Sequence, residues 1–330
     1  MKPLFLMLED GAVFEGTSVD SDVADCEGLL SFDTSTAGFE RVVTDPANMG
    51  KIIVFPSPLT GGAGIDRKDA ESSGPKAAGA IVGRCAAHLC GGLAAYLGSP
   101  RLALGHGFDT RAIMRHLRRN GEMKATLTAK EVCERTLSRR MDAIGCPDYE
   151  PENRPLPCRR AKAGAAVLDL GASKSFFRAL AALKVRDGLN PNEADLVIVS
   201  DAPYYTVEDS SVISQVTGWF GRKPVLGFGH GAAIVARACG ARVSWLQVGH
   251  HGTSVPVRAV SDGRCRTTEQ NHNYTVSPNG GLASLFNDIN DGACEGFVCS
   301  DARAAGVHFV PDEQWFGAVL ASIGVEYKDA

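Results

Sequence analysis

The sequence lacks any long apolar run: none approaches about 18 residues, the length that spans a bilayer as a helix. The opening residues 1–11 hold a short apolar run that Glu9 and Asp10 end at once, which is typical of a β-strand rather than of a signal peptide. We therefore expect no membrane insertion and a cytoplasmic protein. An organellar location stays open for the case of non-standard targeting.

An excess of charge is missing as well. The chain has 34 Lys and Arg against 38 Asp and Glu, a net charge of −4, which gives no reason to expect a nucleic-acid partner. Ten cysteines are scattered without a Cys-x-x-Cys pair, which favours reduced thiols over disulfides or a metal site. We expect no cofactor.

A third absence lies in residues 224–231, Pro-Val-Leu-Gly-Phe-Gly-His-Gly, which precede an apolar helical run. A strand that enters a helix through Gly-x-x-x-Gly is the sequence form of a nucleophile elbow, and its middle residue carries the nucleophile. Here that residue is Gly229, which has no side chain. Such an elbow stores about 1–3 kcal/mol of backbone strain, which glycine avoids. The sequence therefore predicts the turn without its chemistry.

What is present indicates two domains. With 330 residues, 44% of them apolar and 22% charged, the chain is long for one core and typical of a globular protein. Alternating apolar residues at 4–8, 12–14 and 28–32 predict a β-rich first half, with a helix capped by Asp109 or Thr110. In the second half, strands at 165–170, 195–200 and 224–228 alternate with helices, which predicts a parallel sheet.

The first half resembles the N-terminal domain of the carbamoyl-phosphate synthetase small subunit. Residues 108–118 match that family's Ile-Asp-Thr-Arg-Ala-Leu-Thr-Arg-His-Leu-Arg almost residue for residue, and residues 31–46 are similar to its Phe-Asn-Thr-Ser-Met-Thr-Gly-Tyr-Gln-Glu stretch. The second half resembles the family's class I glutamine amidotransferase domain. Residues 247–252, 269–274 and 290–296 are similar to its Phe-Gly-His-His-Gly, Ser-Gln-Asn-His-Gly-Phe and Asn-Asp-Gly-Thr-Val-Glu-Gly motifs.

The resemblance implies an α/β protein with a β-rich N-terminal small-subunit domain at 1–135. A linker follows at 136–163, where prolines gather, and then a flavodoxin-like class I glutamine amidotransferase domain with a parallel-type sheet at 164–330. Only about ten residues separate the helix at 173–184 from the next strand, where the family fits a further strand. We expect that edge strand to be lost.

The resemblance also implies that the catalytic triad is gone. The positions of the family's cysteine, histidine and glutamate hold Gly229, Val310 and Asp312. Ala202 and Tyr204 replace the loop glycines that turn backbone N–H groups toward an oxyanion. The whole degenerate glutamine pocket is expected to comprise Ala47, Ala202, Tyr204, Ala233, Asn271, Asn273 and Tyr274.

Histidines near the altered triad offer a way to test whether the chemistry has moved. His308 lies two residues before Val310, about 6.6 Å along a strand, whereas a base must lie within about 3 Å of its target. We expect that His308 does not reach a group that it could deprotonate, and that His230 is a packed or hydrogen-bonded residue. The paired His250 and His251 are expected to be structural rather than metal ligands, because the family has no metal there.

Three functions remain open. The first is a pseudo-glutaminase, not an enzyme, that serves as a structural or regulatory subunit of a larger protein assembly. The alternative is the small subunit of a carbamoyl-phosphate synthetase that uses free ammonia, in pyrimidine or arginine biosynthesis. The third is new chemistry near His230, Tyr204, His272 and His308. The expected partner is accordingly a synthetase large subunit or another multi-subunit complex.

Overall fold

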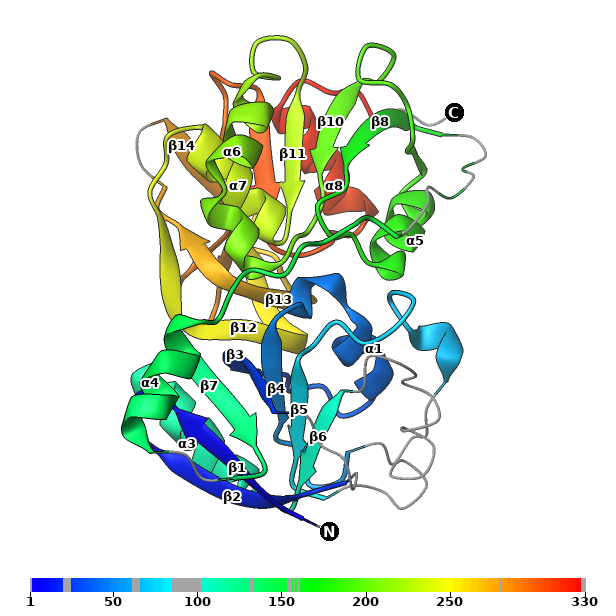
Figure 1. Cartoon of the computed structure of the whole chain (residues 1–330). Coiled ribbons are helices and arrows are strands. Elements are labelled where there is room, and N and C mark those ends of the chain that lie inside the picture. Colours follow the sequence, from blue (N-terminus) through cyan, green and yellow to red (C-terminus); the bar gives the residue numbers. More distant parts are fainter. Residues whose placement is uncertain are drawn as a thin grey trace. The chain divides into compact units, whose positions relative to one another are not determined.

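The structure is a computed structural model that describes residues 2–19, 25–60, 66–84, 102–130, 133–152, 156, 158, 161–278 and 281–327. Two compact units are formed: Met1–Asp148 with Gln247–Gly249, and Tyr149–Leu246 with His250–Ala330 (Figure 1). Helix α4, Glu134–Asp142, overlaps the start of the segment 136–163 that was expected to be a linker. Residues 153–155, 157, 159 and 160 of that segment lie outside the described residues.

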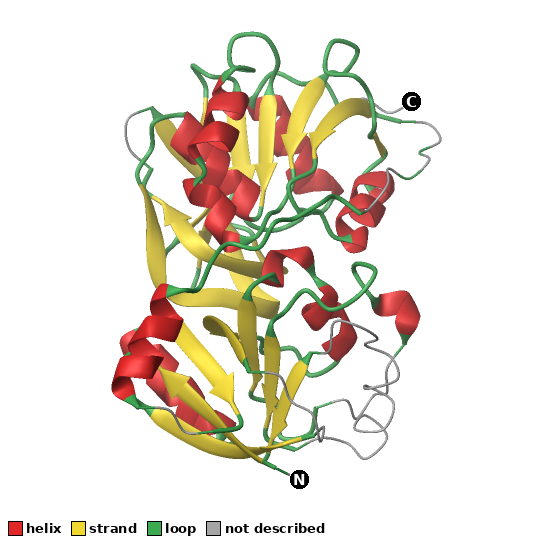
Figure 2. Ribbon diagram, in the orientation of Figure 1, coloured by secondary structure: helices red, strands yellow, loops and turns green. Residues whose placement is uncertain are grey.

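The first unit is built on a closed barrel with the strand order β1-β2-β6-β5-β4-β3-β7 (Figure 2). Its apolar alternation points inward, because the core cluster takes alternate residues of β1 such as Leu4, Leu6 and Leu8. The described strands are β1 Pro3–Leu8, β2 Val13–Ser18, β3 Cys26–Phe32, β4 Lys51–Phe55, β5 Gly79–Val82, β6 Ala103–His106 and β7 Met123–Thr128.

Short helices complete the first unit. The helix expected after Asp109 is confirmed as α3, Thr110–Asn120: the Asp109 carboxylate accepts a hydrogen bond from the Ala112 N–H at 2.9 Å. Its buried face carries Ile113, Met114 and Leu117, as the sequence predicted. The other helices described in this unit are α1 Phe39–Thr44, α4 and the 3₁₀ turns η1 Pro46–Asn48 and η2 Arg67–Asp69.

The second unit holds a sheet in the order β13-β12-β14-β15-β16-β11-β10-β8-β9. The neighbouring strands β16, β11, β10, β8 and β9 are paired in parallel. The other strand pairs of the sheet are antiparallel. The described strands are β8 Ala163–Leu168, β9 Val185–Arg186, β10 Leu196–Val199, β11 Val225–Phe228, β12 Val243–Ala259, β13 Cys265–Val276, β14 Leu282–Asp288, β15 Cys294–Cys299 and β16 Ala304–Val307.

Helices cover both faces of the parallel part. Leu196 and Ile198 of β10 enter the core cluster that holds α5, Lys174–Ala182, and α8, Glu313–Ser322. Their neighbours Val197 and Val199 pack into a second cluster with α6, Ser210–Thr217, and α7, His230–Ala238. A strand buried on both faces reads as an unbroken apolar run, which explains the sequence of β10.

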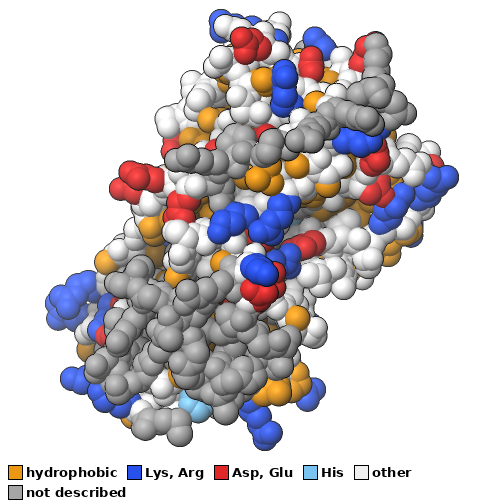
Figure 3. All heavy atoms as spheres, turned by 90° about the vertical axis from the view of Figure 1, so that its right-hand side faces the viewer, with side chains coloured by type: hydrophobic (Ala, Val, Ile, Leu, Met, Phe, Trp, Pro, Cys, Tyr) orange, Lys and Arg blue, Asp and Glu red, His pale blue; other side chains and the backbone are white. Residues whose placement is uncertain are grey.

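One prediction for this unit was wrong. The expected loss of the edge strand is instead a shortening: β9 keeps two residues, Val185 and Arg186, paired in parallel with β8. Among the described residues, no helix combines the length and the apolar character needed to cross a membrane. On the face drawn in Figure 3, acidic and basic side chains are interspersed, in keeping with the small net charge.

Candidate functional site

The predicted elbow lies where β11 ends and α7 begins. Gly229 stands at the N-terminus of α7 with φ 54° and ψ −127°, a conformation that favours glycine. Its N–H donates to the Val307 carbonyl at 3.0 Å, which ties the elbow to the end of β16. The carboxyl ends of neighbouring parallel strands meet here, the usual position of a site in such a sheet.

The space beside the elbow is filled by a carboxylate that sequence reasoning missed. Asp201 follows β10, and a Cβ added to Gly229 would lie 2.5 and 2.6 Å from its two oxygens. A carboxylate oxygen of Asp201 accepts hydrogen bonds from the His230 N–H at 2.8 Å, the His230 ring Nδ1 at 3.0 Å and the Ala202 N–H at 2.8 Å. A cysteine side chain at residue 229 would collide with this carboxylate.

The two backbone N–H groups among those donors are of the kind that an acyl-transfer site offers to its oxyanion. The N–H of the residue after the nucleophile is the usual donor at an elbow, and here it belongs to His230. The second backbone donor belongs to Ala202, on the loop that was expected to lose this role with its glycine. Both donors are directed at the chain's own anion, at the positively polarised end of α7.

Val310 and Asp312, the residues that the resemblance puts at the base and acid positions, lie after β16. Val310 is exposed at 43%. Asp312 caps α8 by accepting the Trp315 N–H at 2.9 Å, and it forms an ion pair with Arg266. The Asp312 side chain is therefore used to cap α8 and to pair with Arg266.

The structure brings most of the expected pocket positions into the second unit. Tyr204 lies edge-on to Trp245, whose ring contacts Tyr274 at 4.8 Å between centroids, and Tyr274 in turn faces the His230 ring at 6.1 Å. Ala202 and Ala233 are fully buried. Ala47 belongs instead to the first unit, in η1.

The two asparagines of the expected glutamine pocket both form hydrogen bonds with the ring of one histidine. Asn271 places its Oδ1 2.8 Å from Nδ1 of His251, and Asn273 places its Nδ2 3.3 Å from Nε2 of the same ring. His251 is 3% exposed. This ring is thus held by hydrogen bonds between side chains of β12 and β13.

His308 contacts the backbone of the elbow. Its Nδ1 donates to the Gly229 carbonyl at 3.0 Å. Strand β16 ends at Val307, so the two-residue alternation that underlies the expectation does not continue to Val310. Burial, together with the neighbouring His272, holds the pKa of His308 well below its ordinary value, so this ring is neutral at physiological pH. His230 is fully buried and hydrogen-bonded to Asp201, as expected.

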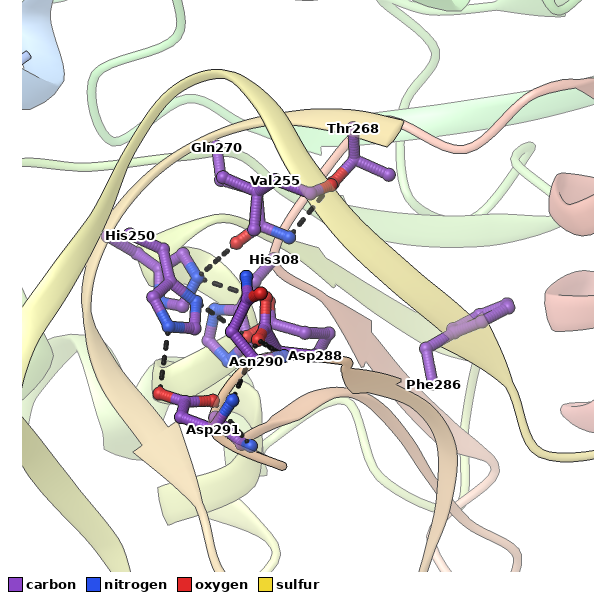
Figure 4. Close-up of polar contacts among 12 residues, drawn as sticks. His250, Val255, Thr268, Gln270, Phe286, Asp288, Asn290, Asp291 and His308 are labelled. Carbon is purple, nitrogen blue, oxygen red and sulfur yellow. Dashed lines mark hydrogen bonds and ion pairs between the residues drawn. The ribbon is translucent and has the colours of Figure 1, made fainter. Parts of the chain in front are cut away.

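A second polar group lies on β12, β13 and β15. His250 and His272 are directly paired in the register of β12 and β13, and both face the fully buried Glu295 of β15. His250 Nδ1 lies 2.9 Å from Glu295 Oε1, and His272 Nε2 lies 3.1 Å from Oε2. Figure 4 shows the other side of the His250 ring, where Nε2 contacts Asp291 at 3.1 Å.

Charge stabilises this group. Burial disfavours the charged form of His250, but the Glu295 and Asp291 carboxylates outweigh that and raise its pKa to about 9. Burial likewise opposes ionisation of Glu295, yet the His272 and His250 rings hold its pKa well below the usual range. Glu295 is therefore an anion between two histidines, and the ligand atoms of the three residues all lie within 4.8 Å of one another.

Comparison with known families places both units. The family described as "Carbamoyl-phosphate synthase small chain, CPSase domain" matches residues 6–127, and "Glutamine amidotransferase class-I" matches residues 166–314. The chain belongs to the carbamoyl-phosphate synthase small-chain family. Its second unit accordingly has the α/β architecture of the class I glutamine amidotransferase domain, and its first unit corresponds to the small-chain CPSase domain.

The relatives match over nearly the full length. The carbamoyl phosphate synthase small chain of Clostridium perfringens is 28% identical over 333 residues, covering 93% of this chain and 93% of the relative. The carbamoyl phosphate synthase pyrimidine-specific small chain of Halalkalibacterium halodurans is 28% identical over 334 residues, covering 93% of this chain and 91% of the relative. A solved glutamine amidotransferase from Thermotoga maritima has 16% identity and a TM-score of 0.36, covering 46% of this chain and 76% of its own.

Within this family pattern, sequence reasoning missed two residues of consequence. Asp201 carried a signal, since an acid stands in the loop where the family has asparagine. Glu295 carried a weaker one, because it keeps a family motif and gives no sign of its partners. Both carboxylates contact histidines that are distant in the sequence, so their partners could not be predicted from the neighbouring residues.

Proposed function

We propose that this chain is a pseudo-glutaminase, a non-catalytic small-chain homologue that serves as a structural or regulatory subunit of a larger protein assembly. The observation that carries the proposal is the Asp201 carboxylate, which occupies the space that a nucleophile at residue 229 needs. It also accepts the two backbone N–H groups that would otherwise stabilise an oxyanion.

Two further observations support the proposal. Losing one member of a catalytic triad lowers the rate by orders of magnitude, and here the nucleophile and base positions hold Gly229 and Val310. His308 contacts the elbow, but its Nδ1 is used by the Gly229 carbonyl and there is no thiol beside it to deprotonate. The cores of both units are nevertheless kept, which is expected of a chain retained for its contacts.

A second candidate is the small chain of a carbamoyl-phosphate synthase that uses free ammonia. The match of the first unit to the small-chain CPSase domain favours it. On this proposal the partner is a large subunit, and the lost glutaminase has no effect on an ammonia-fed reaction.

Glutamate release from glutamine tests the absence of catalysis. We expect the purified chain, alone and with any partner recovered from its source cells, to release glutamate no faster than buffer. Release above that background that disappears in Asp201→Asn or His308→Asn would overturn the proposal and assign new chemistry to the elbow.

Affinity capture of the tagged chain from its native cells separates the two candidates. A synthetase large chain among the captured proteins, identified by mass spectrometry, together with ammonia-dependent carbamoyl phosphate formation, would establish the second candidate. Capture of a complex without a synthetase chain would establish the first.

A further inference from the structure

The group formed by His250, His272 and Glu295 has a use that the proposed function does not require. Glu295 has no exposed side-chain surface, and the His250 side chain is exposed by only 11%. Charged groups are almost never buried this far unless they are paired or bind a metal ion. Three different strands deliver these residues, so the convergence does not come from local sequence.

Two buried atoms in this group lack a well-aligned hydrogen bond. His250 Nδ1 and Glu295 Oε1 face each other at 2.9 Å, yet neither makes an aligned hydrogen bond to any described residue. The great majority of buried polar atoms in proteins are hydrogen-bonded, and an exception calls for a bound water or ion. A cation that both atoms coordinate would replace their direct ion pair.

The other nitrogen of each ring already has the partner that metal-bound histidines need. His272 Nδ1 donates to the Tyr274 carbonyl at 2.8 Å, and His250 Nε2 faces the Asp291 carboxylate at 3.1 Å. A metal-bound histidine almost always donates its second N–H to a carbonyl or carboxylate, which orients the ring and selects the ligand nitrogen. His250 Nδ1 and His272 Nε2 are thereby directed toward Glu295.

Neighbouring groups are less suited to bind the same ion. His308 stacks on His272 with 4.2 Å between ring centroids and 16° between planes, so the in-plane lone pairs of the two rings do not converge. Asp288 and Asp291 form a second set with His250, but Asp288 Oδ1 already accepts the backbone N–H groups of Asn290 and Asp291. Gln270 Oε1, 2.9 Å from His272 Nε2, is the contact that an ion would displace.

We propose that His250 Nδ1, His272 Nε2 and a carboxylate oxygen of Glu295 bind a divalent transition-metal ion, with Zn²⁺ the best match. Two imidazoles and one carboxylate form a common three-ligand zinc set, and the same set suits other first-row divalent metals. The ion links β12, β13 and β15.

Zinc titration of the full chain tests the proposal. The protein is stripped with a chelator, dialysed and titrated with Zn²⁺ against a chromophoric competitor, and the metal content is measured by elemental analysis. We expect one Zn²⁺ per chain and a visible absorption spectrum typical of four-coordinate Co²⁺ when cobalt replaces zinc. His250→Ala is expected to weaken binding by more than about 100-fold, and Asp291→Asn, which removes an outer partner, by about 10-fold.

The controls keep the test decisive if a buried variant folds poorly. Asp291 is 45% exposed, so Asp291→Asn should leave the fold intact. His116→Ala removes a surface histidine that pairs with Asp10 and should leave zinc affinity unchanged. A wild-type chain that binds no more zinc than His250→Ala, or an affinity that is the same in Asp291→Asn, would overturn the metal site. Because zinc binding is read without any activity, these results are independent of the glutaminase assay.

Discussion

Two carboxylates of the second unit each pair with histidine, but their surroundings differ. Asp201, at the elbow, is 26% exposed and is bound by backbone N–H groups at the start of α7 as well as by the His230 ring. Glu295 is fully buried, and its close partners are the His250 and His272 rings. The first arrangement closes a site that the fold provides, whereas the second gathers ligand atoms that a cation can use.

The comparison shows two ways in which one domain stabilises the charge of a carboxylate. At the elbow, a helix N-terminus attracts an anion whatever its source, so an aspartate from the adjacent loop can take the place of a reaction intermediate. In the β12–β13–β15 group, the partners of the Glu295 carboxylate among the described residues are histidine side chains, so its charge depends on them. Removal of each carboxylate should therefore have a different effect.

The largest effect is expected for Glu295→Ala. Breaking a buried ion pair from one side destabilises a protein by about 3–5 kcal/mol, because the remaining partners stay buried without their counter-charge. Urea unfolding in the presence of chelator measures this loss without a contribution from bound metal. Glu313→Ala is the matched control: Glu313 pairs with Lys162 at 2.7 Å but is 55% exposed, so its loss should be below about 1 kcal/mol. Equal losses in the two variants would contradict the contrast.

Gly229→Cys should have the next largest effect. The new side chain adds backbone strain of about 1–3 kcal/mol at a positive φ and also collides with the Asp201 carboxylate. We expect no glutamate release, because Val310 still supplies no base.

A double-mutant cycle separates the strain from the collision. Combining Gly229→Cys with Asp201→Ala should recover about 1 kcal/mol or more of the loss, since the two residues are in contact. Gly240→Cys, at φ 77° with open space around the added Cβ, serves as the control for strain alone. Strict additivity of Gly229→Cys and Asp201→Ala would show that the carboxylate does not fill the space of the nucleophile.

Asp201→Ala alone should destabilise the chain by about 1–2 kcal/mol. It removes an acceptor shared by the N–H groups of His230 and Ala202, in the manner of a lost helix cap, and it leaves the buried His230 ring without that bond. Partial exposure lets water replace the carboxylate, so the loss should stay below that of Glu295→Ala. Thermal unfolding of Asp201→Ala and Glu295→Ala under the same conditions shows which variant loses more stability. A larger loss for Asp201→Ala would contradict the explanation given for the two carboxylates.

More of the fold than of the site could be predicted from the sequence. Alternation predicted the β1 strand, the Asp109 cap predicted the start of α3, and the Gly-x-x-x-Gly pattern predicted the elbow, because each signal is local. The two-residue strand β9 escaped prediction because so short a pairing depends on the neighbouring β8 rather than on its own residues.

The site depended on side chains that meet through tertiary structure. The residues next to Asp201 in the sequence do not predict that its side chain points toward Gly229. That direction is set by the positions of β10 and β11. His308 reached the elbow because β16 ends one residue earlier, and His250 met Glu295 because strands β12 and β15 lie in one sheet. Spacing rules for an isolated strand describe none of these contacts.

The smallest effect is expected for Asp312→Ala, at the position where the resemblance puts the family's glutamate. Asp312 caps α8 through the Trp315 N–H and pairs with Arg266 at the surface, so its removal should destabilise the chain by about 1 kcal/mol. Asp312→Asn retains a cap acceptor and should restore most of the loss, whereas an acid that served the elbow would not be replaced by its amide. Urea midpoints of the two variants make the measurement. If Asn fails where a cap alone should suffice, Asp312 acts through its charge and the elbow retains more of its former electrostatics than its hydrogen bonds reveal.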